Sequence, residues 1–206
     1  MSVSLVFALG VLGLAYFIGG IPTSFLAAKY GAGIDLRQLG SKNLGATNLY
    51  RVLGWKYAVP VGVFDMAKGF VPVVFVATRV DSGDWFPLVV GISAVLGHAF
   101  PIYLKFRGGK GVATAAGVVF GVAPVVTAVS VGVWALILGV TGFMSLASIS
   151  GALAFPIAVS VLAPQNTPLM AAGASLAAFI VFTHRSNIRR LFSGTESRFG
   201  RKRREA

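Results

Sequence analysis

The stretch GSKNLGATNLYR, from Gly40 to Arg51, is rich in hydrogen-bond donors and contains no carboxylate. Glycines at 40 and 45 allow backbone amides to approach a ligand closely. Donors without carboxylates are typical of a site that holds an anion, and the side-chain donors here are Ser41, Lys42, Asn43, Thr47, Asn48 and Arg51. Thr47 or Asn48 could alternatively cap the next helix, and the two roles are compatible because a helix start offers its amides to either.

A second stretch, GHAFPIYLKFRGGKG, ends in a glycine-rich turn, Gly108 to Gly111, that surrounds Lys110. The turn is similar to half of a phosphate loop, and the apolar run after it can start a helix. It lacks the preceding spaced glycine and the following Ser or Thr of the nucleotide-binding pattern, which argues against a nucleoside triphosphatase. A plain turn remains an alternative.

The third stretch, HRSNIRRLFSGTE, runs from His184 to Glu196. On a helix His184 and Asn187 share a face, so imidazole and amide can point together at a ligand. An amphipathic juxtamembrane helix with lipid-facing arginines is the alternative. Elsewhere, Asp65 and Lys68 are three residues apart and can pair along a helix, which predicts a structural ion pair, and the isolated His98 favours an interfacial packing residue.

The composition places these stretches in a membrane protein. Of 206 residues 56% are hydrophobic and 12% charged, and the mean hydropathy is +0.81, which is too apolar for a soluble domain. The first apolar run, Val3 to Ala28, is too long for a signal h-region and is expected to be a retained span. Because the chain has no cysteine and no histidines with neighbouring ligands, we expect no disulfide, no metal and no cofactor.

Charge placement predicts how the chain crosses the membrane. The apolar runs are Val3 to Ala28, Tyr57 to Thr78, Phe86 to Leu104, Val112 to Val140, Ser145 to Ala163 and Thr167 to Phe182. The basic segment 29–56 is expected in the cytoplasm, and the acidic link with Asp81 and Asp84 outside. The run Arg201 to Arg204 in the basic tail is interpreted as a topology signal or a contact with lipid headgroups. This tail also lies in the cytoplasm only if the segment 112–140 crosses the membrane an even number of times.

We therefore expect a break in 112–140, where Gly117, Gly121 and Pro124 weaken a helix. The predicted fold is an all-α integral membrane protein with about seven transmembrane helices, some short or broken. Its amino terminus lies outside and its carboxyl terminus in the cytoplasm. We expect one polytopic domain, 1–206, with a basic tail at about 193–206.

The three stretches in this order, with SLAS at Ser145 to Ser148 and DMAKG at Asp65 to Gly69, resemble the bacterial acyl-phosphate:glycerol-3-phosphate acyltransferases over nearly the whole chain. The resemblance implies transfer of a fatty acyl group from acyl phosphate to the sn-1 hydroxyl of glycerol 3-phosphate, giving lysophosphatidic acid and phosphate. It implies a bacterial cytoplasmic (inner) membrane enzyme facing the cytoplasm, with membrane lipid as a partner. We expect neither nucleic acid nor an obligatory protein partner.

The resemblance also implies roles for single residues. The turn Gly108 to Gly111 would bind the acyl-phosphate phosphate, assisted by Ser41, Thr47 and Asn48. Arg51, Lys110, His184 and Asn187 are the catalytic candidates and, with Ser148, would position glycerol 3-phosphate. Structural support is expected from Asp65, Lys68 and Glu196. The complete predicted binding set is Ser41, Asn43, Gly45, Thr47, Asn48, Arg51, Gly108, Gly109, Lys110, Gly111, Ser145, Ser148, His184 and Asn187.

Proton transfer is expected to be substrate-assisted, because the donor's own phosphate is basic and adjacent to the hydroxyl. An acyl-CoA enzyme with a His-x-x-x-x-Asp pair is disfavoured, since Tyr103 and Arg189 stand at that spacing from the two histidines. A small organic-phosphate transporter remains the alternative, although such folds commonly show inverted repeats and mid-membrane binding residues. A purely structural membrane protein ranks last because it leaves the stretch from Gly40 to Arg51 unexplained.

Overall fold

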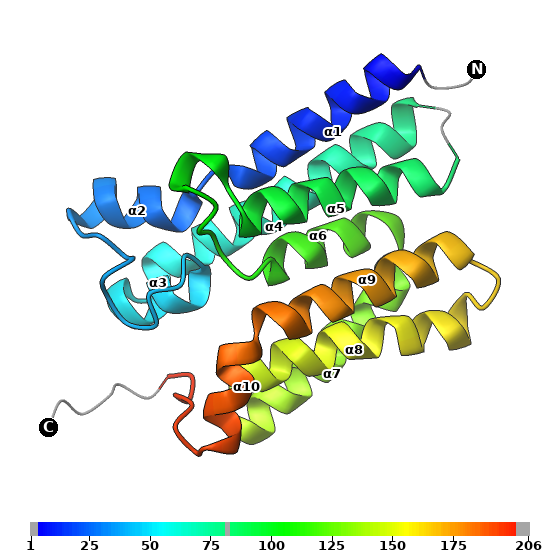
Figure 1. The fold of residues 1–206 in the computed structure, drawn as a ribbon. Coiled ribbons are helices and arrows are strands. Elements are labelled where there is room, and N and C mark those ends of the chain that lie inside the picture. The colour runs from blue at the N-terminus through cyan, green and yellow to red at the C-terminus, as the bar shows by residue number, and fades with distance from the viewer. Residues whose placement is uncertain (1–3, 81–82, 201–206) are drawn as a thin grey trace, which may run out of the picture. The chain divides into compact units, whose positions relative to one another are not determined.

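The computed structural model describes residues 4–80 and 83–200, and the regular elements in these ranges are helices (Figure 1). Asp81 and the basic run Arg201 to Arg204 lie outside the described residues. The chain divides into two compact units, Met1–Ala123 and Pro124–Ala206. The prediction of a single domain stays a prediction.

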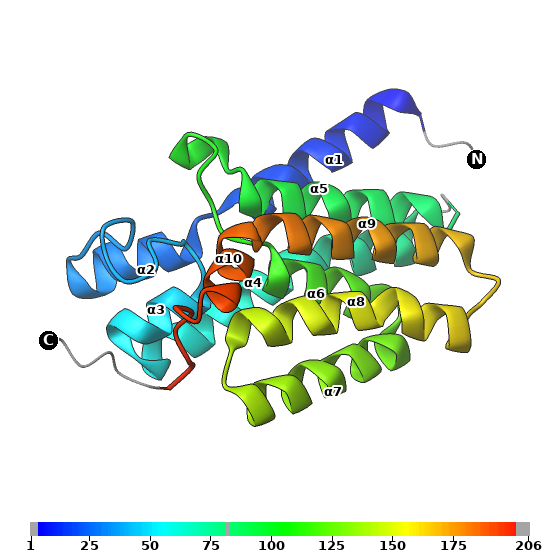
Figure 2. The ribbon, with the colours of Figure 1, turned by 60° about the horizontal axis from the view of Figure 1, so that its bottom comes forward.

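The described residues of unit 1 form four α-helices that lie side by side, two short α-helices and one 3-10 helix. Helices α1, α4, α5 and α6 form the packed group in both views (Figures 1 and 2). A break at Ile21 and Pro22 separates α1 from α2. The elements are α1 (Leu5–Gly20), α2 (Thr23–Ala32), α3 (Ala46–Leu53), α4 (Trp55–Arg79), α5 (Trp85–Ala99), the 3-10 helix η1 (Ile102–Leu104) and α6 (Val112–Val122).

Helices α4 and α6 cross with their backbones in close approach. A Cβ atom on Gly117 of α6 would fall on the carbonyl of Met66, and one on Gly69 of α4 would fall on the carbonyl of Thr114. Small residues at such crossings are a common device in membrane proteins, because packing rather than the hydrophobic effect joins the helices there. The crossing fixes the beginning of α6, and with it the glycine-rich turn, against α4.

Unit 2 is a row of three long helices followed by a short one. Helix α8 (Met144–Leu162) packs between α7 (Pro124–Thr141) and α9 (Thr167–Thr183), and α10 (Arg185–Phe192) follows (Figures 1 and 2). Helix α10 leaves α9 with a bend of 59°. The predicted break within 112–140 falls at Ala123, and α7 begins at Pro124, because proline has no N–H and is tolerated in the first turn of a helix.

Within residues 4–80 and 83–200, five segments are long and apolar enough to cross a membrane, or up to six with the bent pair α9 and α10. The remaining apolar helix, α6, has 11 residues. At 1.5 Å per residue it is about 16 Å long, roughly half the thickness of the hydrocarbon core. The all-helical membrane fold is thus confirmed, with five or six of the about seven predicted segments reaching spanning length. The predicted orientation of the termini stays a prediction.

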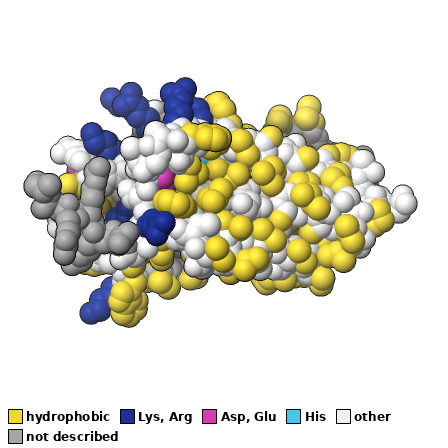
Figure 3. Space-filling view, turned by 90° about the horizontal axis from the view of Figure 1, so that it is seen from below, with side chains coloured by type: hydrophobic (Ala, Val, Ile, Leu, Met, Phe, Trp, Pro, Cys, Tyr) yellow, Lys and Arg dark blue, Asp and Glu magenta, His cyan; other side chains and the backbone are white. Residues whose placement is uncertain are grey.

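Exposed apolar side chains show how the helices meet their surroundings. Hydrophobic side chains cover much of the face shown in Figure 3. On α4, Val63 and Phe64 are 64% and 53% exposed, while the charged Asp65 and Lys68 of the same helix are buried. Apolar side chains on the outside and charges on the inside are expected where lipid replaces water as the solvent.

Candidate functional site

Asn48 organises the donor-rich stretch from Gly40 to Arg51. Its side chain is buried; Oδ1 accepts a hydrogen bond from the Ser41 amide (2.8 Å), and Nδ2 donates to the Leu39 carbonyl (3.1 Å). Gly40 lies between these two partners with a φ of 60°, and a Cβ atom there would overlap Asn48 Oδ1. The asparagine therefore holds the turn against α3 and leaves the Ser41 side chain exposed.

Helix α3 begins at Ala46 without a side-chain cap. Its N-cap is Gly45 in an extended conformation (φ −141°), whose carbonyl accepts from the Asn48 amide at 3.0 Å. Neither Thr47 nor Asn48 caps the helix, so the amides of Ala46 and Thr47 lie without a side-chain cap at the positive end of the helix dipole. Arg51 lies one turn after Thr47, on the same face.

The glycine-rich turn is attached to the end of α5. The Gly108 amide donates to the Ala99 carbonyl at 3.0 Å, and the Gly109 amide donates to the His98 carbonyl at 3.1 Å. These two amides are therefore used to hold the turn. Gly111, in the left-handed conformation (φ 81°), then starts α6 without a side-chain cap. The amides that can serve an anion are those of the first turn of α6, next to Lys110.

A buried polar cluster lies behind this turn. Lys68 Nζ is 2.7 Å from Asp65 Oδ1 and donates to the Ile21 carbonyl at 2.8 Å. Thr23 Oγ1 donates to Asp65 Oδ1 at 2.5 Å, and His98 Nδ1 lies 3.4 Å from Lys68 Nζ. The ion pair that the sequence indicates between Asp65 and Lys68 is formed. It is joined by a threonine from α2 and a histidine from α5.

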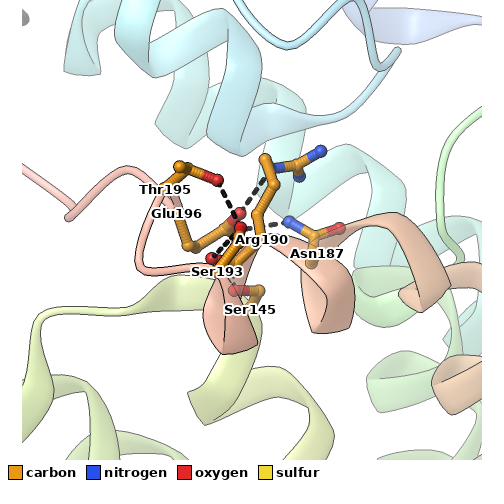
Figure 4. Close-up of polar contacts among 6 residues, drawn as sticks. All are labelled: Ser145, Asn187, Arg190, Ser193, Thr195 and Glu196. Carbon is orange, nitrogen blue, oxygen red and sulfur yellow. Dashed lines mark hydrogen bonds and ion pairs between the residues drawn. The ribbon is translucent and has the colours of Figure 1, made fainter.

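Glu196 is the centre of a second polar cluster, in unit 2 (Figure 4). Its Oε1 accepts from Ser145 Oγ at 2.7 Å and from Asn187 Nδ2 at 2.6 Å, and its Oε2 accepts from Arg190 Nε at 2.7 Å. The carboxylate side chain is only 3% exposed. It ties the start of α8, helix α10 and the loop after α10 together.

The protonation state of Glu196 follows from these contacts. Burial acts to raise the pKa of Glu196, but hydrogen bonds from Ser145, Asn187 and Arg190 outweigh burial and hold the pKa below its usual value. The group is therefore a carboxylate at neutral pH and accepts hydrogen bonds only. This places a fixed negative charge beside Asn187.

His184 lies where α9 ends and α10 begins, and it is buried. Its Nδ1 is 2.8 Å from the Ile180 carbonyl. Because a carbonyl can only accept, we assign the proton to Nδ1, which makes Nε2 the acceptor nitrogen of the neutral ring. The 59° bend at His184 interrupts the single helix on which the sequence places His184 and Asn187. One turn into α8, Ser148 Oγ donates to the Met144 carbonyl at 2.8 Å.

The predicted binding residues are divided between the two units. Within the described residues, no group of three His, Asp or Glu side chains has the geometry to hold a metal ion. The roles predicted for the individual residues stay predictions. Unit 1 contains Ser41, Asn43, Gly45, Thr47, Asn48, Arg51, Gly108, Gly109, Lys110 and Gly111, and unit 2 contains Ser145, Ser148, His184 and Asn187.

Residues 9–194 match the sequence model of a protein family described as glycerol-3-phosphate acyltransferase. The chain belongs to this family. Among curated glycerol-3-phosphate acyltransferases, this acyltransferase is 39% identical to that of Chlorobium phaeobacteroides strain BS1 over 222 residues, covering 91% of this chain and 94% of the relative. It is 40% identical to that of Chlorobaculum parvum over 227 residues, covering 94% and 98%.

Solved structures of the family share the fold. The crystal structure of PlsY (YgiH), an integral membrane glycerol 3-phosphate acyltransferase, in the glycerol 3-phosphate form is 40% identical and superposes with a TM-score of 0.89, covering 94% of this chain and 96% of that chain. The lysophosphatidic acid form is 37% identical, with a TM-score of 0.86 and coverage of 94% and 95%. This acyltransferase is therefore an integral membrane protein of the PlsY type with bacterial relatives.

Two polar residues of the buried cluster in this acyltransferase are not among the predicted site residues. His98 is treated as a packing residue because an isolated histidine carries little information. Thr23 lies in an apolar run and gives no signal. The spacing of ten residues between His98 and Gly108 could have indicated that His98 belongs with the glycine-rich turn. The intervening residues fold back, so that the Gly109 amide donates to the His98 carbonyl.

Proposed function

We propose that this protein transfers a fatty acyl group from acyl phosphate to the sn-1 hydroxyl of glycerol 3-phosphate and releases lysophosphatidic acid and phosphate. This is the first acylation step of bacterial phospholipid synthesis. The observation that carries the proposal is the likeness to PlsY over 94% of the chain, in structures named for their glycerol 3-phosphate and lysophosphatidic acid forms. These two molecules are the acceptor and the product of this reaction.

The donor-rich segments of unit 1 support a substrate that carries phosphate. The starts of α3 and α6 each present first-turn amides without a side-chain cap, and cationic side chains, Arg51 and Lys110, accompany them. We assign the turn Gly108 to Gly111 and the start of α6 to the phosphate of the acyl donor. Ser41 and Thr47 assist, and Asn48, with Asn43 and Gly45, shapes the loop that presents them. Arg51 and Lys110 supply the positive charge that two phosphate-bearing substrates require.

In unit 2 we assign Ser148, His184 and Asn187 to glycerol 3-phosphate. The acceptor nitrogen of His184, Nε2, can receive a hydrogen bond from a substrate hydroxyl. Asn187 Nδ2 donates to Glu196, and this bond sets the orientation of its amide. Ser145 is held by the same carboxylate, so we assign Ser145 and Glu196 to support.

The chemistry is an exchange of one oxygen for another at the acyl carbon. The sn-1 hydroxyl oxygen attacks the acyl carbon, the bond between that carbon and the phosphate oxygen breaks, and phosphate leaves. We propose that the hydroxyl proton passes to the departing phosphate. Hydrogen phosphate is then the second product, and no side chain of the protein has to accept the proton. Fixed donors around the phosphate favour the step because they stabilise charge on the leaving group.

We further propose that the protein lies in the bacterial inner membrane with its polar loops in the cytoplasm, where soluble glycerol 3-phosphate meets a lipid-dissolved donor. Lys42, Lys56 and Lys105 lie in or beside these loops, whereas the described part of the short link between α4 and α5 carries Asp84. This distribution follows the positive-inside rule.

The experiment is lysophosphatidic acid formation by the purified protein with labelled glycerol 3-phosphate, offering acyl phosphate and acyl-CoA in parallel. We expect product from acyl phosphate alone. Product from acyl-CoA alone would overturn the donor assignment. Uptake of the label into proteoliposomes without release of phosphate would favour the transporter instead.

His184 variants test the proton transfer. His184→Asn keeps a donor near the Ile180 carbonyl, and His184→Gln places an amide near the position of Nε2. With substrate-assisted transfer, both variants retain measurable turnover while KM for glycerol 3-phosphate rises. Loss of every trace of turnover with glycerol 3-phosphate binding intact would instead make His184 the base.

A further inference from the structure

The buried cluster of Asp65, Lys68 and His98 is not used by the proposed reaction. The three side chains come from α4 and α5, and the residues are 1%, 3% and 9% exposed. Removing two charges from water costs several kcal/mol per ion, and a well-packed apolar pair in their place is often neutral or stabilising. Stability alone is therefore a weak reason for the cluster, and its contacts indicate a more specific one.

All three protons of the Lys68 ammonium have an acceptor. One is directed to Asp65 Oδ1 at 2.7 Å, one to the Ile21 carbonyl at 2.8 Å, and one to His98 Nδ1 at 3.4 Å. An ammonium has three donors and no acceptor, so its hydrogen-bonding capacity is complete. Lys68 thus connects the break between α1 and α2 to the imidazole at the end of α5.

The contact with Lys68 assigns the tautomer of His98. Lysine can only donate, so Nδ1 must accept, and the proton of the neutral ring lies on Nε2. The alternative, a protonated Nδ1 that donates to Asp65, is disfavoured because that distance is 3.7 Å, beyond hydrogen-bond range. The ring is consequently held with an N–H at Nε2.

Nε2 of this ring lies against the glycine-rich turn. A Cβ atom on Gly109 would fall on His98 Nε2 and would also approach the Leu44 carbonyl closely. The backbone carbonyl of the same histidine accepts a hydrogen bond from the Gly109 amide, and the carbonyl of Ala99 accepts one from the Gly108 amide. The turn is therefore attached to α5 by two backbone hydrogen bonds and supported by the imidazole.

We propose that Asp65, Lys68 and His98 act as positioning residues: Asp65 and Lys68 orient the His98 imidazole, and the imidazole sets the place of the Gly108–Gly109 turn and so the affinity for the phosphate-bearing substrate held there. The inference rests on the proposed function, in which this turn holds acyl phosphate. None of the three residues is assigned a contact with the reacting atoms.

The test compares KM and kcat for both substrates in four variants and in one combination of two of them. His98→Asn leaves an oxygen for Lys68 but no atom that reaches Gly109, while His98→Gln keeps a polar atom near the position of Nε2. The double variant Asp65→Asn/Lys68→Met removes both charges together, so that neither is left unpaired. The control is Ser93→Ala, which deletes a 2.8 Å hydrogen bond from α5 to the Leu12 carbonyl of α1.

We expect His98→Asn and the double variant each to raise KM for acyl phosphate about tenfold, because the turn loses the support of a correctly oriented imidazole, with a smaller change in kcat. His98→Gln recovers part of the affinity, and Ser93→Ala leaves both KM values unchanged. Because Lys68 acts through His98, adding the double change to His98→Asn raises KM little further. If the double variant does not fold, the two His98 variants and the control still carry the test.

Two results separate the possible failures. Unchanged KM values for both substrates, with only the amount of active enzyme reduced, would overturn the positioning role and leave a structural ion pair. A rise confined to KM for glycerol 3-phosphate would support the positioning role but overturn the assignment of the turn to acyl phosphate in the proposed function.

Discussion

Two substitutions of Glu196 separate its negative charge from its hydrogen bonds. Glu196→Gln keeps an oxygen in the position of Oε1, where it accepts from Ser145 and Asn187, but turns an NH₂ group toward Arg190. Glu196→Ala removes all three acceptor contacts. The matched control is Thr195→Ala, which removes a 2.8 Å hydrogen bond between Thr195 Oγ1 and the exposed Ser193 Oγ.

The expected losses follow from burial of the partners. A hydrogen bond to a charged group contributes about 1.5–3 kcal/mol, but the Arg190 side chain is 41% exposed and can be rehydrated, so we expect Glu196→Gln to lose about 1 kcal/mol. In Glu196→Ala, Ser145 and Asn187 remain 4% and 5% exposed without their acceptor. Each such group costs about 1–3 kcal/mol, so the two groups and the Arg190 contact together give a total loss of roughly 3–7 kcal/mol.

The assay is unfolding of the purified protein in detergent, together with turnover of the folded fraction. The order of stability should be wild type, equal to Thr195→Ala, then Glu196→Gln, then Glu196→Ala. A loss of the size expected for alanine is a large part of the 5–15 kcal/mol of a typical protein. Equal stability of the Gln and Ala variants would refute the reasoning, because it would mean that Ser145 and Asn187 do not depend on the carboxylate.

Further predictions concern pH, packing, orientation and metal ions. The pKa of Glu196 is lowered on folding, so the ionised carboxylate stabilises the folded protein above about pH 4.5, the usual pKa, and this stabilisation is lost as the pH falls through the folded pKa. The difference in unfolding free energy between wild type and Glu196→Gln should therefore shrink as the pH falls below about 4.5. Gly117→Ala should lower the melting temperature and turnover, because its Cβ meets the Met66 carbonyl, whereas Gly132→Ala, with open space around it, should lower neither. In an otherwise cysteine-free chain, Asp84→Cys should react with an impermeant maleimide in intact spheroplasts and Lys105→Cys only after permeabilisation, and the reverse pattern would invert the proposed topology. Chelators should leave activity unchanged; inhibition by EDTA that a divalent ion reverses would contradict this.

The membrane fold could be predicted from the sequence because the hydrophobic runs extend over whole helices and most of the charged residues lie between these runs. Composition alone requires lipid as the solvent, and the need for an even number of crossings leads to a break in 112–140, which the structure places at Ala123. The length of α6 could not be predicted in the same way. Its 11 residues end at the break at Ala123, and its close crossing with α4 at Gly69 and Gly117 is a tertiary contact that no single run of residues encodes.

The break between α1 and α2 is a second feature that the sequence conceals. The run Val3 to Ala28 is read as one span, and hydropathy treats Pro22 as one residue among many apolar ones. In the structure Leu5–Ala32 still forms one segment of spanning length, but its helix is interrupted at Ile21 and Pro22, and Lys68 donates to the Ile21 carbonyl. The buried ammonium of a residue on another helix donates to one of the backbone carbonyls that the interruption leaves exposed. Lipid has no donor that could do this.

The candidate site shows a sharper limit of sequence reasoning. Residue types identify which groups can donate to an anion, but not which of them the fold itself consumes. Asn48 uses its amide oxygen and its amide nitrogen to hold the turn at Gly40, and the amides of Gly108 and Gly109 donate to carbonyls of α5. Asn187 is likewise engaged by Glu196.

These engaged groups have a common consequence for the chemistry. An anion site needs donors that do not move when charge develops on the leaving group, and donors at the tips of glycine-rich loops are fixed only if other groups hold the loops. Asn48 does this for the loop before α3, the end of α5 and His98 do it for the turn before α6, and Glu196 does it for α10. The residues that resemble ligands in the sequence therefore belong to two classes, those that hold the loops and those that the held loops present. Substitutions of the first class should alter KM through the position of the second, which makes kinetic measurements on paired variants, one from each class, the way to distinguish them.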